Sequence, residues 1–87
     1  MITIIQIEIP TYDKNKGLQY KWEDGFIVET KIEDGQIVIS ANQAGLISLA
    51  NHFLSLAQQD VAAGCHMHFD EYNSLEEGSV EMVLEKK

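Results

Sequence analysis

Two Asp-Gly pairs, Asp24-Gly25 and Asp34-Gly35, stand ten residues apart in the first half of the chain. Asp-Gly favours a two-residue hairpin turn, because both positions tolerate positive φ. Apolar and polar residues alternate before, between and after the two pairs, over residues 18–23, 26–33 and 36–40. Alternation of this kind is typical of strands with one buried face. The two turns therefore predict a three-stranded antiparallel meander.

The amino terminus adds a fourth strand to this prediction. Apolar and polar residues alternate over 5–9, and Pro10 ends the stretch because proline has no N–H to donate to a ladder. The first residues carry no Lys or Arg and no unbroken apolar run, which is typical neither of a signal peptide nor of a membrane anchor. We therefore expect a cytoplasmic protein that does not bind membranes.

The apolar period changes from two to 3.6 near residue 40, which predicts a helix from about Asn42 to Asp60. Its cap is either Ser40 with Gln43 in a capping box or Asn42 alone. Gly45 in the first turn weakens the helix by up to ~1 kcal/mol relative to alanine. The predicted buried face comprises Leu46, Leu49, Ala50, Phe53 and Ala57, widened by Leu54 and Leu56, while Ser48, Asn51, Ser55, Gln58 and Gln59 lie away from it.

Alternation returns after the helix, over residues 65–69 and again over 80–85, with a polar loop between them. The predicted element order is ββββ-α-ββ. One amphipathic helix laid on one face of a mainly antiparallel sheet is a two-layer α+β fold. The chain of 87 residues is short for more than one domain, so we expect residues 1–87 to form a single domain. Its one cysteine permits no internal disulfide.

Charge is the strongest compositional signal. Six Lys and Arg against fourteen Asp and Glu give a net charge of −8. The 54 residues between Lys31 and Lys86 carry nine acids and no Lys or Arg. Such a chain repels a phosphate backbone, which argues against nucleic-acid binding. It attracts a basic protein partner, although acidity also serves simply to keep a small protein soluble.

The segment GCHMHFDE, residues 64–71, contains the spacing of a metal site. On a strand His66, His68 and Asp70 share one face, and two histidines at this spacing can bind zinc. Asp70, however, lies two strand steps, roughly 13 Å, from His66. His52 lies on the flank of the helix, and no second cluster completes the set. We predict no metal site and interpret this polar row as a recognition or loop-bracing feature. A metal-binding role at this strand stays open as an alternative.

Enzymatic signatures are missing from the sequence. Cys65 has the opposite strand parity to His66 and His68, whereas a nucleophile needs its base within hydrogen-bond reach. We interpret Cys65 as a small buried hydrophobic residue. Paired carboxylates occur at turns and loops, not at a predicted cleft, and there is no Gly-rich phosphate loop. We predict no catalytic residues and no cofactor, so the chain is not expected to be an enzyme.

The loop over residues 70–78 is the better candidate site. It is longer than most hairpin loops, which have ~2–5 residues. It combines acids with an aromatic ring and an amide, a combination suited to a basic protein surface. The alternative is a solvated loop with Leu75 beneath it. Including the outward strand face, the predicted partner-binding residues are His66, His68, Asp70, Glu71, Tyr72, Asn73, Glu76 and Glu77.

The chain from about Ser40 to Lys86 resembles the immunity protein 32 family of bacterial polymorphic toxin systems. The resemblance rests on N-x-x-G-L-x-x-L-A at the start of the helix and on G-x-H-x-H-x-D-x-x-N-x-L-x-x-G-S after it. The positions carried over are His66, His68, Asp70, Asn73, Gly78 and Ser79.

This resemblance implies a non-enzymatic protein that binds and neutralises a toxin from a neighbouring gene. The acidity adds the expectation that the cognate toxin has a basic surface. A structural homo-oligomer, for instance a homodimer, stays open as an alternative.

Overall fold

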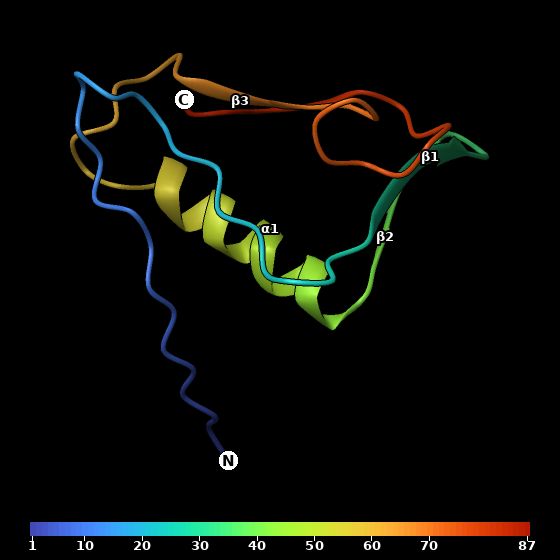
Figure 1. Ribbon diagram of the computed structural model, residues 1–87, viewed down its shortest axis with the longest axis horizontal. Helices are drawn as coiled ribbons and strands as arrows, with labels where there is room; N and C mark the ends of the chain where they lie inside the picture. The colour runs from blue at the N-terminus through green and yellow to red at the C-terminus, as the bar shows by residue number, and fades with distance from the viewer.

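The computed structural model describes residues 1–87 and contains one helix and four strands (Figure 1). β1 and β2 pair in one antiparallel sheet, α1 follows, and β3 and β4 pair in a second antiparallel sheet. The elements are β1 (Val28–Glu33), β2 (Gln36–Ala41), α1 (Gln43–Leu56), β3 (His66–Phe69) and β4 (Met82–Glu85).

The hairpin of β1 and β2 confirms the prediction made from the second Asp-Gly pair. Asp34 and Gly35 have φ of 53° and 76°, and Glu33 pairs with Gln36 across the turn. Two successive positive φ angles are what a type I′ turn requires, and Asp-Gly supplies them with little strain. This pairing places Val28 and Thr30 on the buried side of β1.

The predicted order ββββ-α-ββ with one mainly antiparallel sheet is wrong. The chain forms two separate two-stranded sheets, and neither 5–9 nor 18–23 is a strand. The coarser α+β class holds. The reason lies at β1, whose edge opposite β2 is already occupied: the N–H of Glu76 donates to Val28 O at 2.9 Å, and that of Val80 to Thr30 O at 3.1 Å. Residues 18–23 therefore cannot pair with that edge of β1, as the predicted meander requires.

The two segments predicted as strands are extended, and helix side chains bind the backbone of residues 21 and 23 in the second segment and of residue 8 in the first. The N–H of Lys21 donates to Nε2 of His52 at 3.1 Å, and the N–H of Glu23 donates to Oγ of Ser48 at 2.8 Å. Figure 1 shows residues 18–25 running alongside α1. Further back, Nδ2 of Asn51 donates to the carbonyl of residue 8 at 2.8 Å. Strand-like alternation here reflects docking onto a helix, not pairing in a sheet.

Helix α1 begins after Asn42, whose side chain accepts the N–H of Gly45 at 2.8 Å. Of the two predicted caps, the structure uses Asn42. The helix ends at Leu56, four residues before the predicted end at Asp60. It is not a membrane span, since no helix in the chain is both long and apolar enough to cross a bilayer.

The buried side of α1 is not the side predicted from the apolar period. Of that face, only Leu49 and Leu56 are buried, whereas Leu46 and Phe53 are about half exposed. Buried in their place are residues that were expected to face solvent or were left unassigned: Gly45, Ser48, Asn51, His52 and Ser55. Ser48, Asn51 and His52 are turned inward because they bind the backbone of residues 8–23. Oγ of Ser55 donates instead to Oδ1 of Asn51.

The hydrophobic core lies between α1 and the two sheets. Each of the two strands β1 and β3 contributes to it, as do the helix, the segment after the helix and the long loop between β3 and β4. The buried core residues are Val28, Leu49, Leu56, Val61, Met67, Phe69 and Leu75. A core of seven side chains holds parts of the chain that are far apart in sequence, and the 70–78 loop is anchored in it through Leu75.

Candidate functional site

Strand β3 separates the GCHMHFDE segment into two faces, as alternation predicts. Met67 and Phe69 are buried, and His66 and His68 are exposed. Cys65 is half-buried and packs against the core. The thiol and the two imidazoles therefore belong to different sides of the strand.

The two exposed histidines lie against each other, with ring centroids 4.8 Å apart at nearly a right angle. Nδ1 of His66 is 3.0 Å from the carbonyl oxygen of Gly64. No group of three or more His, Cys, Asp or Glu side chains lies close enough together to hold a metal ion. Asp70, which the strand pattern placed on the same face, lies beyond the end of β3 and turns into the loop.

Asp70 organises the start of the loop. Its Oδ1 accepts the N–H groups of Tyr72 and Asn73, each at 2.9 Å, and its backbone carbonyl accepts that of Leu75 at 2.9 Å. Asn73 completes the exchange: its Oδ1 accepts the N–H of Asp70 at 3.0 Å, and its Nδ2 donates to His68 O at 3.2 Å. These two side chains fix the turn, because aspartate and asparagine can replace backbone partners locally.

The far end of the loop is held in a similar way. Oε2 of Glu71 accepts the N–H of Gly78 at 2.7 Å, and Gly78 has φ of 86°. Oγ of Ser79 accepts the N–H of Thr30 at 3.2 Å, which ties the loop to β1. Leu75, 4% exposed, fills the space beneath. The pattern D-x-x-N-x-L-x-x-G-S is thus a set of loop braces.

Three of the predicted partner-binding side chains on this loop are exposed and are not used in bracing it. Tyr72 is 90% exposed, and Glu76 and Glu77 are exposed without any side-chain hydrogen bond. The one ion pair in the chain joins Lys31 to Glu33, so no basic side chain neutralises the two glutamates. Of the eight predicted residues, Asp70, Glu71 and Asn73 therefore brace the loop, while the histidine pair, Tyr72 and the two glutamates face solvent.

Sequence reasoning gave no role to the aromatic cluster around His52. The His52 ring is fully buried and lies 4.4 Å from the Trp22 ring and 5.3 Å from the Phe69 ring, measured between centroids. Burial lowers the pKa of His52 to about 4. Its Nε2 accepts the N–H of Lys21, which leaves the hydrogen of the neutral ring on Nδ1, an atom without a partner. The sequence contains a signal that could have indicated this cluster: a histidine near the centre of the predicted helix, together with the Tyr-x-Trp segment of residues 20–22.

Tyr20 connects this cluster to the exposed strand. Its hydroxyl accepts the N–H of His68 at 2.9 Å, so the outer edge of β3 is partly covered. The position of the two exposed histidines therefore depends on the packing of Tyr20 against Phe69, whose rings are 5.6 Å apart.

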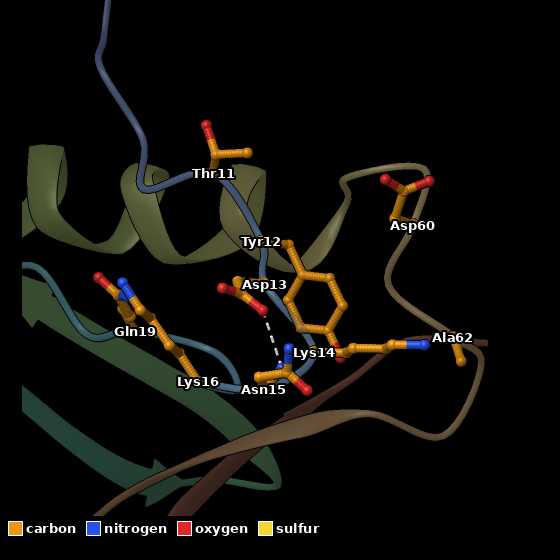
Figure 2. A pocket seen from close by; sticks show the side chains of 9 residues that line it. All are labelled: Thr11, Tyr12, Asp13, Lys14, Asn15, Lys16, Gln19, Asp60 and Ala62. Carbon is orange, nitrogen blue, oxygen red and sulfur yellow. Dashed lines mark hydrogen bonds between the residues drawn. The ribbon is translucent and has the colours of Figure 1, made fainter.

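A polar hollow lies between the 11–19 segment and the residues after the helix (Figure 2). Oδ1 of Asp13 accepts the N–H of Asn15 at 2.9 Å, which shapes the turn. In Figure 2, Gln19 and Asp60 lie at opposite ends of the hollow, and the side chains do not converge on one point. The arrangement offers no pair of groups for acid–base or nucleophilic chemistry.

Comparison with known protein families identifies a match. The model of the family immunity protein 32 matches residues 36–87, which is more than half of the chain and includes β2, α1 and the second sheet with its loop. No curated protein matches the chain, and no solved structure does. The matched range contains both motifs on which the resemblance was based. The chain belongs to the immunity protein 32 family.

Proposed function

We propose that this chain is a non-enzymatic immunity protein that binds a cognate bacterial toxin with a basic surface and thereby neutralises it. The family supplies the class of function. The observation that carries the finer proposal is the braced loop, which presents Tyr72, Glu76 and Glu77 together without a neutralising cation.

The bracing supports this role because it reduces the entropy lost on binding. A loop held by Asp70, Asn73 and Leu75 has little freedom left to lose when a partner docks. An exposed tyrosine supplies contact area, and nearby carboxylates pair with Lys or Arg. Charge of this sign also accelerates encounter with a basic protein, an effect that salt weakens.

The first test is co-expression with the toxin encoded beside this gene, where the protein should restore growth. Glu77→Lys should weaken neutralisation and slow association, because it places a cation on the proposed contact surface. Asp60→Lys is the matched control, since it also changes the net charge from −8 to −6 but lies after the helix, away from the loop. We expect Asp60→Lys to behave like the unchanged protein.

Association rates measured at low and high salt complete the test. The rate should fall as salt rises, and this dependence should be smaller for Glu77→Lys than for Asp60→Lys. Failure to rescue growth would contradict the neutralising role. Equal effects of the two substitutions would instead contradict the loop as the contact surface.

A further inference from the structure

The outward side of α1 is apolar along its whole length. At about 100° per residue, the exposed helix residues after the first turn fall in one arc of roughly 120°. They are Leu46, Ile47, Ala50, Phe53 and Leu54. The C-cap residue Ala57 and Gln43 of the first turn lie on the same arc, where Gln43 is the one polar residue. The inward side carries the polar residues Ser48, Asn51, His52 and Ser55. A surface helix of a monomer normally shows the reverse arrangement.

The amino-terminal segment extends this apolar surface. Residues 5–8 lie beside the helix and form a groove with Leu46, Ile47, Ala50 and Leu54. Beyond the groove the chain continues outward, and Figure 1 shows its end projecting from the rest of the molecule. Met1, Ile2, Ile4 and Ile5 are each more than 80% exposed. Residues 1–7 make no hydrogen bond, so an extended backbone with strand-like sequence has no partner within its own chain.

We propose that these two features form one interface, and that its occupant is a second copy of this chain related by a two-fold axis. Identical extended segments can pair antiparallel across such an axis, and each then satisfies the backbone groups of the other. The apolar arc of α1 meets its own counterpart in the same way. Each chain thus carries both kinds of contact, the extended segment and the apolar arc, that its partner needs.

The exposed area agrees with what a dimer requires. The surface carries eight large apolar side chains: Met1, Ile2, Ile4, Ile5, Leu46, Ile47, Phe53 and Leu54. A large apolar side chain that is fully exposed presents roughly 60–120 Å² of apolar surface. These eight are between 39% and 124% exposed, so together they expose on the order of 500 Å². A stable homodimer buries ~800 Å² on each partner, of which about two thirds is apolar. The surface therefore supplies one side of an interface of ordinary size.

Charge favours a second copy over the proposed toxin at this face. The charged residues along the groove are Glu8, Lys21 and Glu23, a rim that contains both signs. A basic partner would find no concentration of acids here, whereas a rim of mixed sign is complementary to itself. The acidic loop between β3 and β4 remains available in such a dimer, since α1 turns its opposite side toward β3 and that loop.

The test is the mass of the full chain in solution, measured by sedimentation or light scattering from low micromolar to near-millimolar concentration. We expect twice the monomer mass of 9.8 kDa. Leu46→Glu combined with Phe53→Glu should raise the dimer dissociation constant roughly a hundredfold or more, because it forces charges into an apolar contact. Ile37→Glu on β2 is the matched control: Ile37 is 79% exposed but lies outside the surface, and its substitution should leave the dimer intact.

Ile5→Glu gives an independent variant, because residue 5 takes no part in the core and its substitution does not threaten the fold. Circular dichroism should be the same for all four proteins. A monomer at every concentration would overturn the proposal, as would a dimer that resists these substitutions or is lost equally with Ile37→Glu. A monomer that loses toxin binding through Leu46→Glu would assign this face to the toxin instead. The mass measurement needs no toxin, so failure of the dimer and failure of neutralisation are observed separately.

Discussion

Replacing Gly45 by alanine is expected to destabilise the protein, although alanine is the better helix former. Propensity alone predicts a gain of up to ~1 kcal/mol in the free energy of unfolding. In the structure, however, a Cβ at position 45 would lie 2.4 Å from the carbonyl oxygen of Ile27 and 2.9 Å from Cγ2 of Val28. The helix approaches the start of β1 so closely there that only a hydrogen atom fits.

The magnitude follows from what must move. Carbon and carbonyl oxygen approach to about 3.3 Å at closest, so the helix and residue 27 must separate by roughly 1 Å. That carbonyl is fixed, because it accepts the N–H of Asn42 at 3.1 Å, and the Asn42 side chain in turn caps Gly45. Overpacking of this kind costs ~1–3 kcal/mol, and disturbing the cap costs ~1 kcal/mol more. After the propensity gain is subtracted, we expect a net loss of about 1–3 kcal/mol.

Urea and thermal unfolding measure this loss directly. For a domain of this size the midpoint temperature should fall by roughly 5–20 °C. Ala44→Gly is the control, since it makes the reverse change one residue earlier, where ordinary propensity should apply and the loss should be ~1 kcal/mol. Both substitutions are thus expected to destabilise. Stability of Gly45→Ala at or above that of the unchanged protein would refute the close approach of the helix to β1.

The remaining predictions concern His52 and Leu75. The unfolded chain protonates His52 near pH 6.5 and the folded chain only near pH 4, so stability should be full above 6.5 and fall as pH drops toward 4, by at most about 3 kcal/mol. In urea unfolding at several pH values, His52→Gln should flatten this dependence. Leu75→Ala should cost ~2–5 kcal/mol and weaken toxin binding, whereas Tyr72→Ala should weaken binding with stability changed by less than ~0.5 kcal/mol. Equal stability losses for these two variants would contradict the distinction between anchor and contact residue.

Local sequence signals identified the elements that depend on local chemistry. Asp34-Gly35 predicted its hairpin correctly because few other residue pairs tolerate two successive positive φ angles. Asn42 was one of two predicted caps, and alternation over 66–69 gave the correct buried side. For the polar row that ends at Asp70, a recognition role and a loop-bracing role were both left open, and the structure shows Asp70 and Asn73 bracing the loop.

The failures share one physical cause. Alternation predicts an extended segment but does not identify its hydrogen-bond partner, so residues 5–9 and 18–23 were assigned to a sheet. The backbone of residues 8, 21 and 23 binds polar side chains on a helix, namely Asn51, His52 and Ser48, and residues 5–7 make no hydrogen bond within the chain. The same interactions explain why the buried face of the helix was predicted wrongly. A face rich in serine and asparagine is predicted to be solvent-exposed unless its backbone partners are known.

The attachment of residues 8–23 to helix side chains has a consequence for how sequences of this family can diverge. Backbone N–H and C=O groups are common to nearly all residue types, so the extended segment can change its side chains widely and still bind. The helix side chains that bind it cannot change in this way, because Ser48, Asn51 and His52 supply specific donors and acceptors. Relatives aligned on α1 are therefore expected to keep these three polar positions while their amino-terminal segments vary, which fits a family match that begins only at residue 36.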